Sequence, residues 1–203
     1  METSRRQNDI LDAAFALIAE QGIQELTMKN LAKAIGVSEP AIYRHFDSKA
    51  SILAAIVGRI LAMKEAAWQQ ALSAESGTQR TEESLSRFFL HQASSFQSFP
   101  PLMIILYPDL LFQQDPALLR RVQEMIEETG VRVRTLLRKG VESGSLRKDL
   151  DIEIASLQLV GGFRLLVSEW KLHEAARKGE KSLVERTRRY IDSSIRLMSG
   201  KGS

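Results

Sequence analysis

The sequence predicts an all-α protein, and three observations lead to this expectation. Hydrophobic residues make up 44% of the 203 residues, and they recur at helical spacing rather than in alternation with polar ones. Aromatic residues are only 6%, and β-branched residues rarely follow one another. Glycines and small polar residues stand at the ends of the apolar stretches, where helix caps belong. We expect about nine helices, in a small unit over residues 1–47 and a larger unit over residues 48–203.

The N-terminal unit is expected to hold three helices. The first spans residues 8–21 and has one apolar face. Thr27 is the expected N-cap of a short second helix that Gly36 ends, and Ser38 caps a third helix that runs to about Phe46. Glycine at position 36 allows the left-handed backbone that a steep turn between two helices requires.

The larger unit is expected to consist of six helices, of which the third is short. Asp115 and Asp151 are the expected N-caps of the fourth and fifth of these helices, and two consecutive prolines separate the second from the third. The expected spans are 49–73, 82–97, 102–112, 115–143, 152–176 and 183–198.

The composition excludes several kinds of site. The chain has no cysteine, so it has no disulfide framework, iron–sulfur cluster, thiolate zinc site or cysteine nucleophile. The three histidines, His45, His91 and His173, are far apart in the sequence, and no phosphate-binding loop, dinucleotide fingerprint or Gly-x-Ser-x-Gly motif occurs. We therefore expect a protein that is not an enzyme and uses neither a metal nor a cofactor.

The apolar pattern also argues against a membrane protein. The N-terminus has no apolar signal segment, and the richest apolar stretch, residues 102–112, is interrupted by Pro108 and Asp109. A membrane-spanning helix needs about 18 or more consecutive apolar residues. The expected location is the cytoplasm, with no membrane partner.

The second and third helices have the lengths and the turn of a helix-turn-helix. On the third helix, Ile42 and Phe46 share one face, while Arg44 points the opposite way between Pro40 and Ala41. Small residues around one arginine suit a helix that enters the DNA major groove, where arginine pairs with guanine or holds a phosphate. The candidate DNA contacts are Arg5, Arg6, Thr27, Lys29, Ser38, Glu39, Pro40, Ala41, Tyr43, Arg44, His45 and Lys49.

Overall charge does not decide whether the chain binds DNA. The net charge is +3, yet residues 1–50 hold six basic and seven acidic residues. Glu39 places an acidic group beside the expected groove surface, where it either accepts a hydrogen bond from cytosine N4 or excludes other sequences. Both alternatives stay open. The expectation of DNA binding therefore comes from the local pattern of residues.

Residues 27–49 resemble the N-terminal module of the TetR family of bacterial transcription regulators. The family pattern is threonine, a gap, Leu-Ala, Gly-Val-Ser, Tyr-x-His-Phe and lysine. The matching positions are Thr27, Leu31, Ala32, Gly36, Val37, Ser38, Tyr43, His45, Phe46 and Lys49. Glu39-Pro40 is less usual for the family, so the base preference of this chain does not follow from the resemblance.

The resemblance implies a homodimer, whose last two helices pair with their copies, and an effector cavity in the larger unit. The expected interface residues are Leu159, Phe163, Leu166, Leu183, Thr187, Ile191 and Ile195. The candidate effector contacts are Phe89, Gln92, Phe96, Met103, Tyr107, Phe112, Phe163, Arg164 and Trp170. Two alternatives remain open: the 152–176 helix is enclosed within a monomer, or the aromatic residues are ordinary core.

The expected function is a ligand-responsive regulator of transcription. A dimeric repressor would bind a palindromic operator and leave it when a small apolar or amphipathic effector binds. The alternative is a DNA-binding protein of the same fold that acts through a protein partner without a small-molecule ligand.

Overall fold

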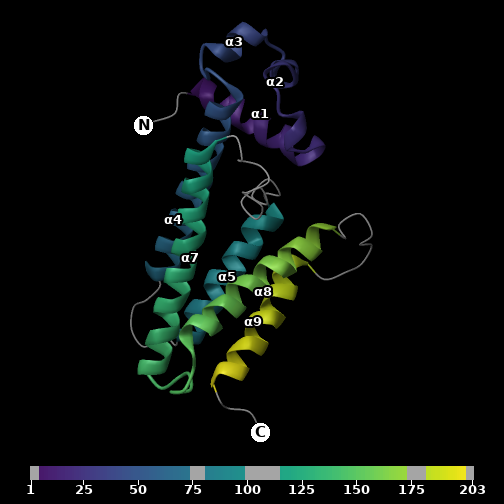
Figure 1. The fold of residues 1–203 in the computed structure, drawn as a ribbon. Helices are drawn as coiled ribbons and strands as arrows, with labels where there is room; N and C mark the ends of the chain where they lie inside the picture. Colours follow the sequence, from purple (N-terminus) through teal and green to yellow (C-terminus); the bar gives the residue numbers. More distant parts are fainter. Residues whose placement is uncertain (1–4, 74–80, 99–114, 173–181, 200–203) are drawn as a thin grey trace. The chain divides into compact units, whose positions relative to one another are not determined.

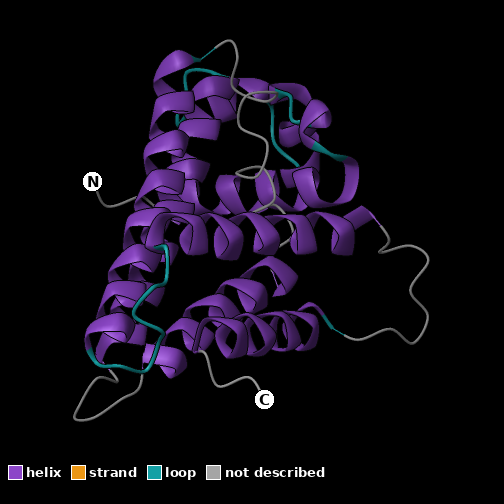
Figure 2. Cartoon of the chain, turned by 60° about the horizontal axis from the view of Figure 1, so that its bottom comes forward, coloured by secondary structure: helices purple, strands orange, loops and turns teal. Residues whose placement is uncertain are grey.

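The computed structural model describes residues 5–73, 81–98, 115–172 and 182–199, which form eight α-helices, one 3-10 turn and no strand (Figures 1 and 2). The expected all-α fold is confirmed. The expected helix over 102–112 lies outside the described residues, as does the end of the 152–176 helix. No helix in the described ranges is long and apolar enough to cross a membrane.

The chain divides into two compact units. The first reaches Met63, within α4 (Lys49–Ser73), and includes the start of α7 (Pro116–Glu142) up to Arg120. The second unit consists of residues 64–107 and 121–203, which include the remainder of α4 and α7. The boundary expected after residue 47 remains our proposal for where the DNA-binding module ends.

The first unit also contains α1 (Arg5–Gln21), a 3-10 turn (Ile23–Glu25), α2 (Met28–Ile35) and α3 (Glu39–Tyr43). Helix α1 packs on α2, and α2 packs on α3. The core is a set of apolar side chains that are fully or almost fully buried. It includes Ile10, Ala14, Leu31, Ile42, Phe46, Ile52 and Ile56.

Helix α2 has the two caps that the sequence predicts. The Thr27 hydroxyl accepts a hydrogen bond from the backbone N–H of Asn30 at 3.1 Å, which satisfies one of the free donors at the helix start. Such a cap contributes about 1 kcal/mol. At the other end, Gly36 has φ 74° and ψ 35°, a left-handed conformation that turns the chain toward α3.

The second unit adds α5 (Thr81–Ser98), α8 (Ile152–Leu172) and α9 (Leu183–Ser199). Helix α5 packs on α8 and α9, which also pack on each other. An edge-to-face pair joins α5 to α8, with 5.3 Å between the ring centroids of Phe89 and Phe163. Within α5, Phe88 and Phe89 form a second such pair, with 5.2 Å between their centroids.

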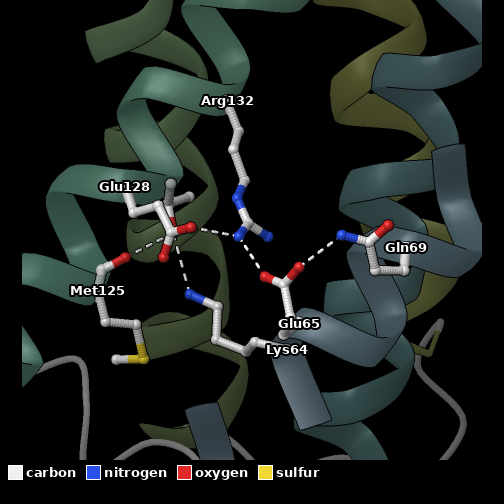
Figure 3. A network of polar contacts seen from close by, with 7 residues as sticks. Lys64, Glu65, Gln69, Met125, Glu128 and Arg132 are labelled. Atoms are coloured by element: carbon white, nitrogen blue, oxygen red, sulfur yellow. Dashed lines mark hydrogen bonds and ion pairs between the residues drawn. The ribbon is translucent and has the colours of Figure 1, made fainter. Parts of the chain in front are cut away.

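A polar network joins α4 and α7 within the second unit (Figure 3). The Arg132 guanidinium forms ion pairs with Glu65, at 2.5 Å, and with Glu128, and it lies 4.9 Å from the centre of the Trp68 ring. Beside it, the ammonium of Lys64 donates to the Thr129 hydroxyl at 2.9 Å. The network therefore places two cations and two carboxylates next to one another.

The network shifts the pKa values of two of its members. Burial, with a smaller contribution from repulsion by Arg132, lowers the pKa of Lys64 from 10.5 to about 8. Hydrogen bonds from Gln69 and then Arg132 lower the pKa of the Glu65 carboxyl. Glu65 therefore stays ionised at neutral pH, whereas Lys64 titrates only slightly above it.

Candidate nucleic-acid interface

Helix α3 turns one side into the first unit and the other to solvent. Ile42 is 1% exposed and Phe46, just after the helix, is 6% exposed, whereas Tyr43 is 48% exposed. Glu39 and Arg44 are also exposed. These inward and outward sides are those that the helical spacing predicts. The outward side is a short convex surface of the kind that fits a major groove.

Helix α3 has only five residues, so its position depends on its neighbours. The turn before it is held by a hydrogen bond from the Val37 N–H to the Ala32 carbonyl at 2.9 Å. After it, the backbone N–H of Phe46 donates to the Ile42 carbonyl at 3.0 Å. The helix itself spans only Glu39–Tyr43, and a turn at residues 44–45 replaces the expected helical continuation to Phe46.

Two of the expected DNA contacts are hydroxyls at helix starts of the first unit, and their hydrogen bonds differ. Ser38 is the N-cap of α3, and its side chain makes no capping hydrogen bond. Thr27 is exposed, although its oxygen already accepts from Asn30. A hydroxyl that bonds nothing within its own helix is free to donate to a phosphate oxygen. Ser38 is therefore the better placed of the two.

The expected phosphate-binding cations lie on several elements of the first unit. Arg5, Arg6 and Lys29 are exposed, and Arg6 makes a long ion pair with Asp9 at 3.8 Å. Lys49 is half-buried, and its ammonium donates to the Ile23 carbonyl at 3.4 Å, so DNA would compete with that contact.

The structure adds one cation that the motif does not include. Lys33 is exposed on α2 one turn after Lys29, so both extend from one side of that helix. The sequence itself shows the spacing of four residues between Lys29 and Lys33, so Lys33 could have been included among the candidate DNA contacts.

Three of the nine expected effector residues are part of the core. Phe89, Phe96 and Phe163 are buried and lie against one another, with 6.1 Å between the ring centres of Phe96 and Phe163. Gln92, Arg164 and Trp170 are half-buried, while Met103, Tyr107 and Phe112 lie outside the described residues. Two surface hollows of the second unit lie elsewhere: about 570 Å³ between α5 and α9, and about 310 Å³ between α8 and α9.

The expected dimer residues are mostly buried within the protomer. They are Leu159, Phe163, Leu183, Thr187, Ile191 and Ile195, six of the seven. These side chains contribute to the protomer's own core, and their place in a dimer interface stays a prediction. Leu166 is half-buried, and it lines the smaller hollow with Tyr190 and two arginines of α9.

The exposed apolar residues of the same two helices indicate another surface. Leu157 is 69% exposed, Leu165 62% and Ile154 50%, and their spacing on α8 places them on one face with Gly161. On α9, Leu197 is 78% exposed. The sequence could not distinguish the two faces, because α8 is apolar almost all round.

Residues 10–56 match the family model described as bacterial regulatory proteins, tetR family. This range includes all of α2 and α3 and ends inside α4. This segment carries the N-terminal domain of the tetR family of bacterial regulatory proteins. The resemblance that the sequence showed over residues 27–49 is thus confirmed.

The similar proteins differ in how much of this chain they match. A nucleoid occlusion factor SlmA of Haemophilus ducreyi is 46% identical over 56 residues, which are 27% of this chain and 28% of that protein. The HTH-type transcriptional repressor KstR2 of Rhodococcus jostii is 27% identical over 156 residues, which are 75% of this chain and 73% of the relative. In the first case the match spans less than a third of the relative.

Two solved structures share the TetR fold over nearly the whole chain. The TetR-family transcriptional regulator PfmR from Thermus thermophilus has 26% identity and a TM-score of 0.75, and the match covers 92% of this chain and 97% of that one. The regulator FadR from Bacillus subtilis, solved with stearoyl-CoA, has 21% identity and a TM-score of 0.70, with coverage of 98% and 100%.

Proposed function

We propose that this chain is a ligand-responsive, sequence-specific DNA-binding regulator of transcription, acting in the cytoplasm as a dimeric repressor. In this proposal a small apolar or amphipathic effector releases it from a palindromic operator. The observation that carries the proposal is the outer side of α3, where Glu39, Tyr43 and Arg44 are exposed within the segment that matches the family.

The exposed faces of α8 and α9 support the dimeric form. A second copy that covers Ile154, Leu157, Leu165 and Leu197 would remove four large apolar side chains from water. Such a symmetric pair presents two copies of α3, so its half-sites should be inverted repeats about 34 Å apart, or a multiple of that distance.

Similar proteins support the repressor part and the effector part of the proposal, one protein for each part. KstR2 of Rhodococcus jostii is named a transcriptional repressor, and FadR from Bacillus subtilis was solved with stearoyl-CoA. In this chain Phe89, Phe96 and Phe163 form an apolar cluster that an acyl chain would have to enter. Gln92 and Arg164 would supply the polar contacts.

A second candidate function is favoured by one relative. The nucleoid occlusion factor of Haemophilus ducreyi is 46% identical over the matched segment. A protein of that kind would bind DNA with the same α3 surface, but it would respond to a protein partner rather than to a small molecule. The two candidates therefore differ in the second unit and not in the first.

The proposed function is tested by selecting binding sites from a randomised duplex library at a fixed moderate salt concentration. We expect enrichment of one palindrome. A folded and dimeric protein that enriches no sequence, with or without cell metabolites, would refute sequence-specific binding. Stearoyl-CoA titrated into the operator complex then separates the two candidates, because release supports the effector and unchanged affinity favours the protein partner.

The assigned surface is tested by substitution. Tyr43→Ala and Lys49→Ala should each weaken binding to every duplex, and the lysine variant should lower the slope of log affinity against log salt by about 1. Lys148→Ala, which removes an exposed lysine of the second unit, is the matched control. Unchanged affinity in both α3-side variants would show that this surface does not contact DNA.

A further inference from the structure

The first residue of α3, Glu39, carries a charge that is unfavourable beside DNA. It is exposed and shares its short helix with Pro40 and Tyr43. A carboxylate brought into the major groove approaches phosphates of like charge, and it loses water in doing so. Its presence on the outer side of α3 therefore lowers DNA affinity unless the groove offers it a hydrogen-bond donor.

Three other acidic groups of the first unit have partners within the protein. Asp9 pairs with Arg6 at 3.8 Å, and Asp12 pairs with Arg59 at 2.5 Å. Glu25 accepts a hydrogen bond from the Asn30 side chain at 3.1 Å. Glu39 makes no ion pair or hydrogen bond to another side chain in the described part of the chain, so its oxygens are available to an external donor.

Base edges differ in what they offer to a carboxylate. Cytosine presents its N4 amino group in the major groove as a donor with no acceptor on the same base edge. Adenine presents N6 beside the acceptor N7, and guanine presents two acceptors, both of which repel a carboxylate. A carboxylate therefore prefers cytosine, whereas a glutamine side chain, which both donates and accepts, prefers adenine.

We propose that Glu39 is a specificity-determining residue that selects cytosine at one position of each operator half-site. This inference rests on the proposed function, since it needs α3 to enter the major groove. At that position the cytosine amino group donates to the Glu39 carboxylate. At other sequences the carboxylate is left unpaired near phosphates, so Glu39 weakens binding to sites that lack the cytosine.

Four proteins test the inference in the same library selection: the wild-type chain, Glu39→Gln, Glu39→Ala and Glu20→Gln. Glu20 is an exposed glutamate near the end of α1, so Glu20→Gln removes the same charge from the same unit away from α3. All four should fold alike, because both glutamates lie on the surface, and circular dichroism checks this.

We expect the wild-type chain and Glu20→Gln to enrich cytosine at one position of each half-site, by about 5- to 150-fold over the other bases, the range of one good base contact. Glu39→Gln should enrich adenine there, and Glu39→Ala should show no preference. Both Glu39 variants should bind a random duplex more tightly than Glu20→Gln does.

Each outcome has one meaning. If the wild-type chain enriches a palindrome but neither Glu39 variant changes any position of it, Glu39 does not read a base and the inference is wrong. The same holds if the position that changes is not a cytosine in the wild-type site. If the wild-type chain enriches nothing, the proposed function fails first and the inference fails with it.

Discussion

Lys64 shows how strongly its surroundings change a residue that is ordinary in the sequence. Its ammonium has one hydrogen bond, to Thr129, and it lies beside Arg132. Nothing in the sequence around Lys64 distinguishes it from an exposed helical lysine. Its pKa is lowered first by burial and then by repulsion from Arg132 of α7.

This lowered pKa predicts that the second unit becomes more stable as pH rises above about 8. Between the folded pKa of about 8 and the unfolded value of 10.5, the unfolded chain binds more protons. The free energy of unfolding should therefore increase with pH, by up to about 1.4 kcal/mol per pH unit. Burial raises the pKa of Tyr190 above its usual value of 10.0, which opposes this trend only near and above pH 10.

The measurement is denaturant unfolding followed by tryptophan fluorescence from pH 7 to 9.5. Both tryptophans, Trp68 and Trp170, belong to the second unit. Lys64→Met should remove the rise with pH, and Lys148→Met, in an exposed position, should keep it. An equal rise in wild type and Lys64→Met would contradict the assignment.

Gly162 is a second residue whose role depends on one contact. The hydroxyl of Tyr190 donates to the carbonyl of Gln158 at 2.7 Å, and it passes so close to α8 that a Cβ on Gly162 would lie 2.4 Å from it. Gly162→Ala should therefore cost about 1–3 kcal/mol through overpacking.

The same substitution in a Tyr190→Ala background provides the control. There the obstructing ring is gone, so the added methyl should cost little or even stabilise α8, since alanine favours helix. A double-mutant cycle of unfolding free energies measures the difference. Equal costs in both backgrounds would mean that Tyr190 is not what constrains position 162.

At the scale of elements, the sequence predicts helix ends better than helix faces. Thr27, Asp115 and Asp151 act as N-caps, and Gly36 acts as a C-cap, because capping depends on local chemistry. The face of α8 that enters the core is set by which neighbours pack on it. Local sequence carries no such information for a helix that is apolar almost all round.

The turn between α2 and α3 gives a prediction at this scale. Gly36→Ala should lower the stability of the first unit by about 1–2 kcal/mol, since alanine is strained at positive φ. Gly58→Ala is the matched control: Gly58 is inside α4 in the same unit, and an added Cβ meets nothing within 4 Å. An added Cβ at Gly36 also meets nothing within 4 Å. A loss of stability seen only in Gly36→Ala would therefore come from the strained backbone and not from a steric clash.

At the scale of the whole molecule, the proposed dimer depends on the exposed residues of α8 and α9. Leu157→Glu combined with Leu165→Glu should give a monomer in sedimentation velocity, because two charges would be buried without partners in the interface. The protomer should stay folded, since both side chains are exposed. Operator binding should fall with the loss of the second α3.

The control for the dimer prediction is Ser94→Glu, which adds a charge at an exposed position of α5. It should remain dimeric. A double leucine variant that still sediments as a dimer would place the interface elsewhere on the second unit.

The small buried contribution of α3 has a consequence for evolution. Of its five residues, only Ile42 is buried, so the others can change with little effect on folding. Selection removes substitutions that make a protein too unstable to function, and substitutions at these exposed positions of α3 seldom do so. After gene duplication, two copies of such a protein can therefore diverge rapidly in the DNA they recognise while keeping the same scaffold.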